Sequence, residues 1–563
     1  MGYDVVVVGG GSAGCVVAAR ISADERRDVL LVEAGPDYPR VADLPPDIAD
    51  ESMPAMSHDW GLVSDPDESR HSIPLPRGRL VGGCSATNAC FALRGWPTDY
   101  DGWAAMGNPG WSFAELLPVM VAVESDADFG GDWHGSDGPV PIRRPPPGAW
   151  SPLQRAFADA AATVGHAVVG DHNRPGAVGI GPGPRNVRDG LRMSSALTHL
   201  AAARGRPNLT IRPGTVVDRV ELRGTTARGI RTADGEIVES DVVVLAAGSY
   251  ASPVILMRSG IGPAAGLRGL GIRVTADLAG VGGNLIDHPL APVDLPTSPG
   301  YAGPRFQMML TMRSRHARPD GPPDLHLFAA GPFDDDASPS GGVFGIVTGL
   351  LSVRSRGSVR LRSADPGDPP HIDVAHLRHR EDMARMLEAT LEARRLSRTP
   401  PLAGVRHRSR ARSRSRDRRR RHGRTGPFDP GTGRHLPPPG GNMRDGAQPR
   451  RRRGGRRPRE GPRDRRALGG GRLGDANHPR REHQPFNDHG CRARGAMATG
   501  GVTSLDRQSP GRVRRSRPRR SGRSFPPIGH IAPSRRVSAL TGATRPGDTS
   551  TAAPSASQFG TGR

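Results

Sequence analysis

The chain opens with an apolar strand that leads directly into a glycine-rich turn. Residues 5–8 are four consecutive valines, a run typical of a strand buried in a parallel sheet. Gly9, Gly11 and Gly14 follow with the G-x-G-x-x-G spacing, and residues 15–21 continue as an expected helix. These glycines permit the tight turn, the approach of a pyrophosphate to the backbone, and close packing of helix on strand. The N–H groups at the helix start, around Ser12 and Ala13, would then face the phosphates.

A second apolar strand and an acidic residue complete the pattern. Residues 29–32 are Val-Leu-Leu-Val, and Glu33 and Ala34 follow them. An acid roughly 20 residues beyond the glycine turn normally binds the ribose hydroxyls of an adenine dinucleotide. A chance glycine-rich turn is the alternative, but it does not explain strand, turn, helix, strand and acid in this order. We therefore predict an adenine-dinucleotide site.

The charge is divided unevenly along the 563 residues. The net charge is +23, yet residues 1–400 contain 39 arginines and 46 acidic residues, whereas residues 401–563 contain 40 arginines and 10 acidic residues. The chain has no lysine, which is expected of translation from a very GC-rich gene. We expect the first part to be an ordinary folded protein and the arginine-rich tail, residues 406–563, to be largely disordered.

The cysteines and the N-terminus bear on the cellular compartment. Cys15, Cys84, Cys90 and Cys491 form neither a C-x-x-C pair nor a Cys/His metal spacing, so we expect no metal site and no structural disulfide. The N-terminus lacks a basic segment, and its valine run is too short for a signal peptide or a membrane span. These features predict a cytoplasmic protein without a membrane partner.

A glycine-rich passage at residues 76–91 resembles a known family signature. Its paired glycines end at Gly83, and the next eight residues are Cys-Ser-Ala-Thr-Asn-Ala-Cys-Phe. From the residues alone, a tight structural loop is the alternative. The passage is similar to the first signature of the glucose–methanol–choline (GMC) oxidoreductases, which oxidise alcohols with FAD. The resemblance implies flavin contacts from Gly83, Asn88, Ala89, Cys90 and Phe91. Some members attach FAD through a histidine at the position of Thr87, so threonine implies noncovalent FAD.

Further passages extend the resemblance to about residue 405. Residues 248–263 match the second family signature, and residues 278–289 resemble the family loop that ends in Asp-His-Pro. We interpret His288 in this loop as structural rather than as a catalytic base. In the family, the residue that matches Val217 contacts the adenine through its backbone. An ordinary strand valine is equally compatible with the sequence.

The resemblance implies an α/β fold with a doubly wound FAD-binding domain and a substrate domain on an antiparallel sheet. The expected parts are residues 1–150 and 201–290 for the FAD-binding domain, 151–200 for a crossing segment, 291–405 for the substrate domain and 406–563 for the tail. Alternating apolar and polar side chains, as in residues 324–328 and 358–362, support the antiparallel sheet. A helix ending near Leu396 is expected to bury one face, formed by Met383, Met386, Leu387 and Leu391.

Two catalytic segments of the family are absent from the sequence. The family has a histidine shortly before Gly-Thr-Cys-x-Met-Gly, and an Asn or His in a segment like Asn-Thr-Asn-x-x-Thr-Ile-Met. This pair handles the alcohol proton while hydride moves to the flavin. Residues 406–563 are instead rich in Arg, Pro and Gly. We therefore assign no catalytic residue.

Genetic-code degeneracy tests whether the tail is translated out of frame. Residues 441–446 have codons GGN AAY ATG CGN GAY GGN, which permit Gly-Thr-Cys-Ala-Met-Gly when read one base later. The same shift lets residues 435–440 encode Thr-Tyr-His-His-Pro-Val. It also lets residues 477–491 encode a segment containing Asn-Thr-Asn-Pro-Ser-Thr-Ile-Met. Both absent motifs return in one frame and in the right order. We infer a frameshift near Val405, with the natural stop near residue 502.

The predicted function is FAD-dependent oxidation of the CH–OH group of a small-molecule alcohol, with the electron acceptor unassigned. The chain as written is expected to turn over alcohols poorly or not at all. A nucleic-acid-binding protein that uses the arginine-rich tail is the rival. Residues 406–524 contain only Phe428 and Phe486 as aromatics besides histidine, which disfavours specific nucleic-acid binding. The two signature passages disfavour an NAD-dependent enzyme.

Overall fold

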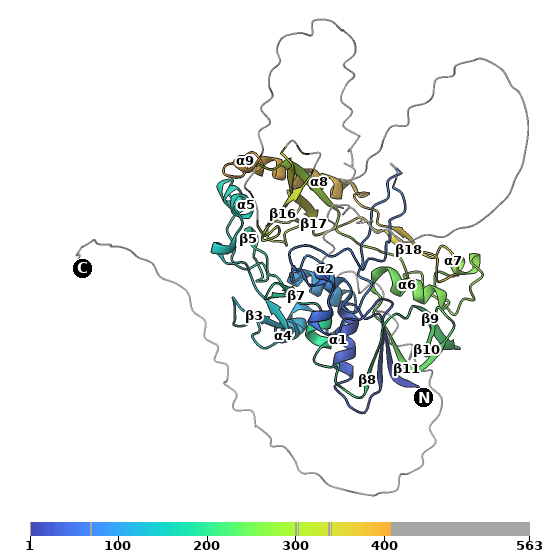
Figure 1. Cartoon of the computed structure of the whole chain (residues 1–563). Helices are drawn as coiled ribbons and strands as arrows, with labels where there is room; N and C mark the ends of the chain where they lie inside the picture. The colour runs from blue at the N-terminus through green and yellow to red at the C-terminus, as the bar shows by residue number, and fades with distance from the viewer. Residues whose placement is uncertain are drawn as a thin grey trace, which may run out of the picture. The chain divides into compact units, whose positions relative to one another are not determined.

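The computed structural model describes residues 2–67, 70–298, 301, 303–335, 338 and 340–406. The predictions for residues 407–563, including disorder of the tail, lie outside the described residues. Within the described part, the two largest sheets have six and five strands, and helices pack against each of them (Figure 1). The larger hydrophobic clusters lie on these sheets.

The first sheet combines strands from two distant parts of the chain. Its order is β8-β2-β1-β11-β10-β9; the first four strands are parallel and the last two are antiparallel. The bounds are β1 (Tyr3–Val8), β2 (Val29–Val32), β8 (Leu209–Arg212), β9 (Val217–Arg223), β10 (Thr226–Thr232) and β11 (Ile237–Leu245).

The valine run is buried because it packs on both faces of this sheet. Val5 and Val7 contact helix α1 (Ser12–Ile21) and its neighbours, whereas Val6 and Val8 pack with β9, β10 and helix α6 (Gly248–Arg258). All four side chains are at most 3% exposed. The run therefore forms a central parallel strand, as predicted.

Residues between β2 and β8 form mostly short helices and strands. They are η1 (Val41–Asp43), α2 (Pro46–Ala49), η2 (Gly83–Ala86), α3 (Pro97–Ala105), α4 (Phe113–Val123), β3 (Glu124–Asp126), β4 (Val140–Ile142), η3 (Pro147–Ala149), α5 (Pro152–Thr163), β5 (Ile180–Pro182), β6 (Val187–Arg188), β7 (Leu191–Arg192) and η4 (Ala196–Leu200). After α6 come β12 (Ile261–Gly262), α7 (Ala264–Gly269) and β13 (Ala276–Asp277). A reciprocal capping box opens α4: Ser112 Oγ accepts from the Glu115 N–H (3.4 Å), and the Glu115 carboxylate accepts from the Ser112 N–H (3.1 Å).

The second sheet is antiparallel and has the order β14-β17-β16-β15-β5. Its further strands are β14 (Leu290–Pro296), β15 (Met308–Met312), β16 (Leu325–Asp334) and β17 (Gly342–Leu350). One face packs against α5, α8 (Arg380–Leu396) and α9 (Leu402–Val405). The antiparallel sheet of the substrate region is thus confirmed, but its edge strand β5 comes from the segment expected only to cross between domains.

Residues 358–362 were expected to form a strand of this antiparallel sheet, and that expectation is wrong. β18 (Ser358–Arg360) pairs only with β19 (His371–Asp373) among the described strands. Val359 and Ile372 then pack in the cluster that contains Tyr250 of α6. An alternating pattern shows that one face is buried, but it does not identify the sheet to which the strand belongs.

The predicted buried face of α8 is also wrong for three of its four residues. Met386 is buried, but Met383, Leu387 and Leu391 are 44%, 57% and 57% exposed. The helix turns Ala389, Ala393 and Leu396 to the sheet instead. Apolar residues occupy two sides of this helix, and small alanines allow the closer approach to β17.

Candidate functional site

The glycine turn and the glycine-rich passage meet backbone against backbone. A Cβ on Gly83 would lie 2.6 Å from the Cα of Gly11, and Gly83 has φ +50°. The Gly82 N–H donates to the carbonyl oxygen of Gly10 at 2.7 Å. The Ser85 N–H donates to Ser12 Oγ at 3.2 Å. Two passages that are about 70 residues apart in the chain therefore form one cradle of bare backbone.

Gly14 shows why the third glycine of the motif is required. A Cβ at this position would lie 1.8 Å from the carbonyl oxygen of Gly9. Gly9 itself has φ +98°, a conformation that favours glycine. Ser12 and Ala13 begin α1 directly beside this turn. The turn has the close helix–strand packing expected of a pyrophosphate-binding motif.

Glu33 lies at the end of β2 and points back to the glycine turn. Its carboxylate accepts from the N–H of Gly10 at 2.8 Å and from the N–H of Gly35 at 2.9 Å. Burial raises the pKa of Glu33, and these two donors oppose that shift. The Thr215 N–H donates to the Glu33 carbonyl oxygen at 2.8 Å, so the residues just before Val217 lie beside Glu33 and Ala34. Val217 is buried at the start of β9.

The loop of residues 88–91 joins the cradle to the second sheet. Asn88 Oδ1 accepts from the Cys90 N–H at 3.0 Å, and Cys90 has φ +64°. Ala89 and Cys90 are buried, and burial raises the pKa of the Cys90 thiol. The Phe91 ring lies 6.5 Å from the ring of Phe328 on β16, centroid to centroid.

The face of the second sheet on the side of Phe91 is an apolar wall. Phe328 and Val347 pack there with Phe306, and Phe91 lies against them. His326 shares this face, because it lies two residues before Phe328 on β16. The two rings are 5.7 Å apart and nearly perpendicular. The position of His326 on this face follows from the sequence, because alternation along a strand places residues 326 and 328 on the same side.

His288 contributes to the position of the loop before β14. Its Nδ1 contacts the backbone carbonyl oxygen of Leu350 at the end of β17. This contact agrees with the structural interpretation of the residue.

None of the described helices is long and apolar enough to cross a membrane.

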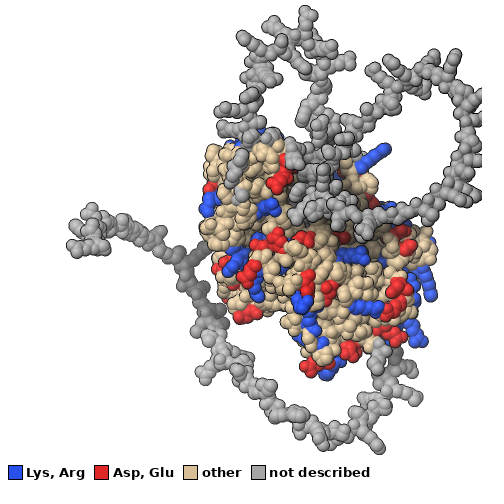
Figure 2. Space-filling view, viewed as in Figure 1, with Lys and Arg blue, Asp and Glu red and all other residues tan. Residues whose placement is uncertain are grey.

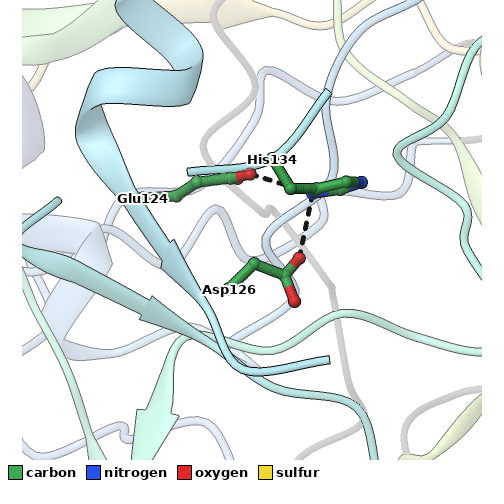
Figure 3. Close-up of side chains that lie close together, drawn as sticks. All are labelled: Glu124, Asp126 and His134. Atoms are coloured by element: carbon green, nitrogen blue, oxygen red, sulfur yellow. Dashed lines mark hydrogen bonds and ion pairs between the residues drawn. The ribbon is translucent and has the colours of Figure 1, made fainter. Parts of the chain in front are cut away.

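A second cluster of ionisable groups lies beside the loop of residues 88–91. Figure 3 shows Glu124 and Asp126 converging on one edge of the His134 ring, with Nδ1 at 2.9 Å and 3.0 Å from their carboxylate oxygens. On its other side, His134 Nε2 lies 2.8 Å from Asp171 Oδ2. Within the described residues, Glu124, Asp126 and His134 are the group whose atoms could together hold a metal ion.

Two arginines make this cluster an ion-pair network rather than a metal site. Arg94 contacts Glu124 at 2.7 Å, and Arg144 contacts Asp126 at 2.8 Å and Asp171 at 2.7 Å. Three carboxylates therefore face two guanidiniums and an imidazole with acceptors at both nitrogens. A divalent ion added here would leave an excess of buried positive charge.

The network also holds the residues that directly follow the loop of residues 88–91. The Arg94 N–H donates to Asn173 Oδ1 at 2.9 Å, and Asn173 Nδ2 donates to the Ala92 carbonyl oxygen at 2.9 Å. Burial alone would raise the pKa of Asp171, but the Asn173 N–H and the charge of Arg144 lower it overall. The cluster thus fixes residues 92–94, directly after Phe91.

Replacing Asp126 by Asn is expected to destabilise the protein by about 3–5 kcal/mol, because it leaves Arg144 and His134 buried with one carboxylate fewer. The free energy of unfolding in urea measures this change. Asp132→Asn, at an exposed position in the segment between β3 and β4, is the matched control and should change stability by less than about 0.5 kcal/mol. Equal effects of the two substitutions would contradict the network.

The parallel sheet, the glycine cradle and the acid at the end of β2 define a protein that binds an adenine dinucleotide in an α/β domain. Comparison with known proteins places the chain more narrowly. A family model described as GMC oxidoreductase matches residues 3–290, and a second with the same description matches residues 353–429. The chain belongs to the GMC oxidoreductase family. The second match extends beyond Val405, where we placed the end of the resemblance.

Several relatives have named activities. Pyridoxine 4-oxidase of Microbacterium luteolum is 34% identical over 420 residues, which are 71% of this chain and 82% of that protein. 5-(Hydroxymethyl)furfural oxidase of Methylovorus sp. (strain MP688) is 36% identical over 409 residues, or 68% and 76% of the two chains. The crystal structure of pyridoxine 4-oxidase from "Mesorbium loti" has a TM-score of 0.66 and 34% identity, and covers 72% of this chain and 82% of that one. The family consists of FAD-dependent oxidoreductases that act on alcohols, which confirms the predicted cofactor and enzyme class.

Proposed function

We propose that this protein is an alcohol-oxidising flavoenzyme whose C-terminal part is translated out of frame, so that it lacks its catalytic base. The observation that carries the first half of the proposal is the cradle of Gly11 against Gly83, which a single Cβ would fill. The return of two absent motifs in one shifted frame carries the second half. The cradle accounts for cofactor binding, and the lost motifs account for an expected loss of turnover.

The residues of the cradle fit FAD. We assign Gly9, Gly11, Ser12, Ala13 and Gly14 to the pyrophosphate, Glu33 and Ala34 to the ribose, Val217 to the adenine, and Gly83 with Asn88, Ala89, Cys90 and Phe91 to the flavin. When bound, FAD supplies the acceptor for the hydride. The flavin would be noncovalent, since Thr87 offers no imidazole for attachment.

The apolar wall supports a small-molecule alcohol as substrate. Phe91 lies between the loop of residues 88–91 and Phe328, and Phe306 and Val347 pack with Phe328 in a buried apolar cluster. A pocket that opens beside this cluster would bind the body of the alcohol and exclude water from the reacting carbon. The expected parts of the chain remain those given above: residues 1–150 and 201–290 for FAD, 151–200 crossing, and 291–405 for substrate.

A cytoplasmic location is part of the proposal. Cys15 and Cys90 are buried thiols outside any disulfide, and burial raises the pKa of Cys15 to about 12. Buried, protonated thiols of this kind are typical of proteins that fold in a reducing compartment. On the face shown in Figure 2, arginine side chains of the described residues are interspersed with acidic ones. That face therefore has no continuous basic surface of the kind that nucleic-acid-binding proteins use.

Anaerobic reduction of the flavin tests the proposed function. The frame-restored protein, loaded with FAD, is mixed with pyridoxine, choline, 5-(hydroxymethyl)furfural and simple primary alcohols. Bleaching of the flavin absorbance by at least one of them is expected. Reduction by NADH or NADPH, with none by the alcohols, would instead show a different enzyme class.

The rival function has its own test. RNA retention on filters is measured for the chain as written and for the frame-restored protein over a range of salt concentrations. We expect salt-sensitive retention to disappear with the arginine-rich tail, while flavin reduction appears. Retention of one RNA sequence over others by the chain as written would favour the rival.

A further inference from the structure

A cavity of about 220 Å³ lies at the edge of the apolar cluster that contains Phe328. Phe306 lines this cavity and packs with Phe328 in the cluster. The other walls come from residues 51–52, from residues 303–305 and from Arg185. The cavity therefore has an apolar wall on the side of the cluster and charged side chains around the rest.

Arg185 joins the cavity to the loop of residues 88–91. It lies opposite Phe91 in an antiparallel bridge, and the Asn186 N–H donates to the carbonyl oxygen of Cys90 at 2.9 Å. Arg185 is only 7% exposed. One terminal nitrogen donates to the backbone carbonyl oxygen of Glu51, and the other lies 3.7 Å from the Glu51 carboxylate. Its buried Nε has no hydrogen-bond partner among the described residues, so this guanidinium has a donor to spare.

A second guanidinium lines the same cavity. The Nε of Arg305 donates to the carbonyl oxygen of Pro332 at 3.1 Å, and the group lies 5.5 Å from the centre of the Phe333 ring. No carboxylate of the described residues forms an ion pair with Arg305. The terminal nitrogens of this half-buried side chain are therefore left as donors for a ligand.

The charges around the cavity favour a single negative charge. Its charged lining consists of Arg185, Arg305 and Glu51, with a sum of +1. The Ser52 hydroxyl donates to Asp50 at 2.7 Å, and that carboxylate is exposed and outside the lining. A carboxylate would neutralise the cavity, whereas a phosphate dianion would leave an excess of negative charge beside Glu51. The planar guanidinium group also matches the two oxygens of a carboxylate.

The wall formed by residues 51–52 is held in place independently of Arg185. Arg192 of β7 is 1% exposed and donates to the carbonyl oxygens of Asp50 at 2.6 Å and Met53 at 2.5 Å. Because these bonds fix both ends of the short segment, the cavity is formed before a ligand enters.

We propose that this cavity binds a carboxylate of the alcohol substrate between Arg185 and Arg305, so that the substrate class is a hydroxy acid. The inference rests on the proposed function and narrows its substrate. The apolar body of the hydroxy acid would lie against Phe306, while its hydroxyl-bearing carbon extends toward the loop of residues 88–91.

Calorimetric titration of the full-length chain, with FAD present, tests the inference without turnover. The ligands are 4-(hydroxymethyl)benzoate and 4-(hydroxymethyl)benzamide, which share a shape but differ in charge. The acid should bind at least about 10-fold more tightly than the amide, since hydrogen bonds to charged groups are the stronger ones. Equal affinities would overturn the inference.

Acetate tests whether the cavity is a site for free anions only. It should bind at least about 10-fold more weakly than 4-(hydroxymethyl)benzoate, because it has no aromatic body to lie against Phe306. If acetate binds as tightly as the aromatic acid, the cavity does not select a substrate and the inference fails.

Two substitutions with opposite expected effects make the test specific for the cavity. Arg305→Gln should weaken binding of the acid at least about 10-fold and leave that of the amide unchanged. Glu51→Gln removes the negative charge of the lining and should tighten binding of the acid at least about threefold. Arg223→Gln, at an exposed position of β9, makes the same charge change as Arg305→Gln and should have no effect. Equal effects of the two arginine substitutions would contradict the assignment.

The outcomes separate this inference from the proposed function. Flavin reduction by uncharged alcohols, together with equal binding of the acid and the amide, would overturn the inference and leave the proposed function standing. Preferential binding of the acid, together with no flavin reduction by any alcohol, would support a carboxylate site and contradict the proposed function.

Discussion

Restoring the reading frame by one base near codon 405 is expected to raise the rate of alcohol-dependent flavin reduction at least about 100-fold over the chain as written. The chain as written contains neither the histidine nor the Asn/His partner of the family. Positioned general acid–base catalysis contributes roughly 100- to 10,000-fold to such reactions. Stopped-flow absorbance under anaerobic conditions measures the rate for both proteins at equal flavin content.

The restored histidine supplies the control for this experiment. The shifted codons of residues 435–440 permit two adjacent histidines, and replacing each in turn by Asn identifies the base. One replacement should return the rate to that of the chain as written, while flavin binding is unchanged. Flavin reduction by the chain as written at the rate of the restored protein would refute the loss of the base.

Replacing Gly83 by Ala is expected to weaken FAD binding at least about 100-fold, or about 2.8 kcal/mol. The new Cβ would lie 2.6 Å from the Cα of Gly11, and neither backbone can move without opening the cradle. The φ of +50° adds strain for any residue with a side chain. Titration of the apoprotein with FAD, followed by flavin fluorescence, measures the affinity in the frame-restored protein.

Gly110→Ala separates the clash from the strain. Gly110 also has a positive φ, of +84°, but an added Cβ there meets no atom within 4 Å. This variant should lose some stability and keep its affinity for FAD. If Gly83→Ala and Gly110→Ala bind FAD equally well, the contact of Gly83 with Gly11 does not shape the cofactor site.

The local features of the dinucleotide site could be predicted from the sequence because they depend on short-range geometry. The valine strand, the glycine turn, the first helix and the acid after the second strand are close together in the sequence. The structure has each of them in its expected place. The capping box at Ser112 is local in the same sense. Whether these residues bind FAD as assigned stays a prediction.

Features that depend on long-range packing could not be predicted in this way. The contact of Gly83 with Gly11 and the joining of β5 to β15 link residues that are distant in the chain. The charges around His134 come from five other residues between Arg94 and Asp171, and their spacing in the sequence does not predict that they meet. The exposed side of α8 was mistaken for its buried side because both carry apolar residues.

The coding DNA from codon 398 to codon 512, read one base later, tests the frameshift most directly. We expect an open second frame from about codon 405 that encodes Gly-Thr-Cys-x-Met-Gly at codons 441–446, Asn-Thr-Asn further on, and a stop near codon 502. Stop codons within that frame, or other residues at both motifs, would contradict the proposal. The arginine-rich tail would then be the protein's own C-terminus.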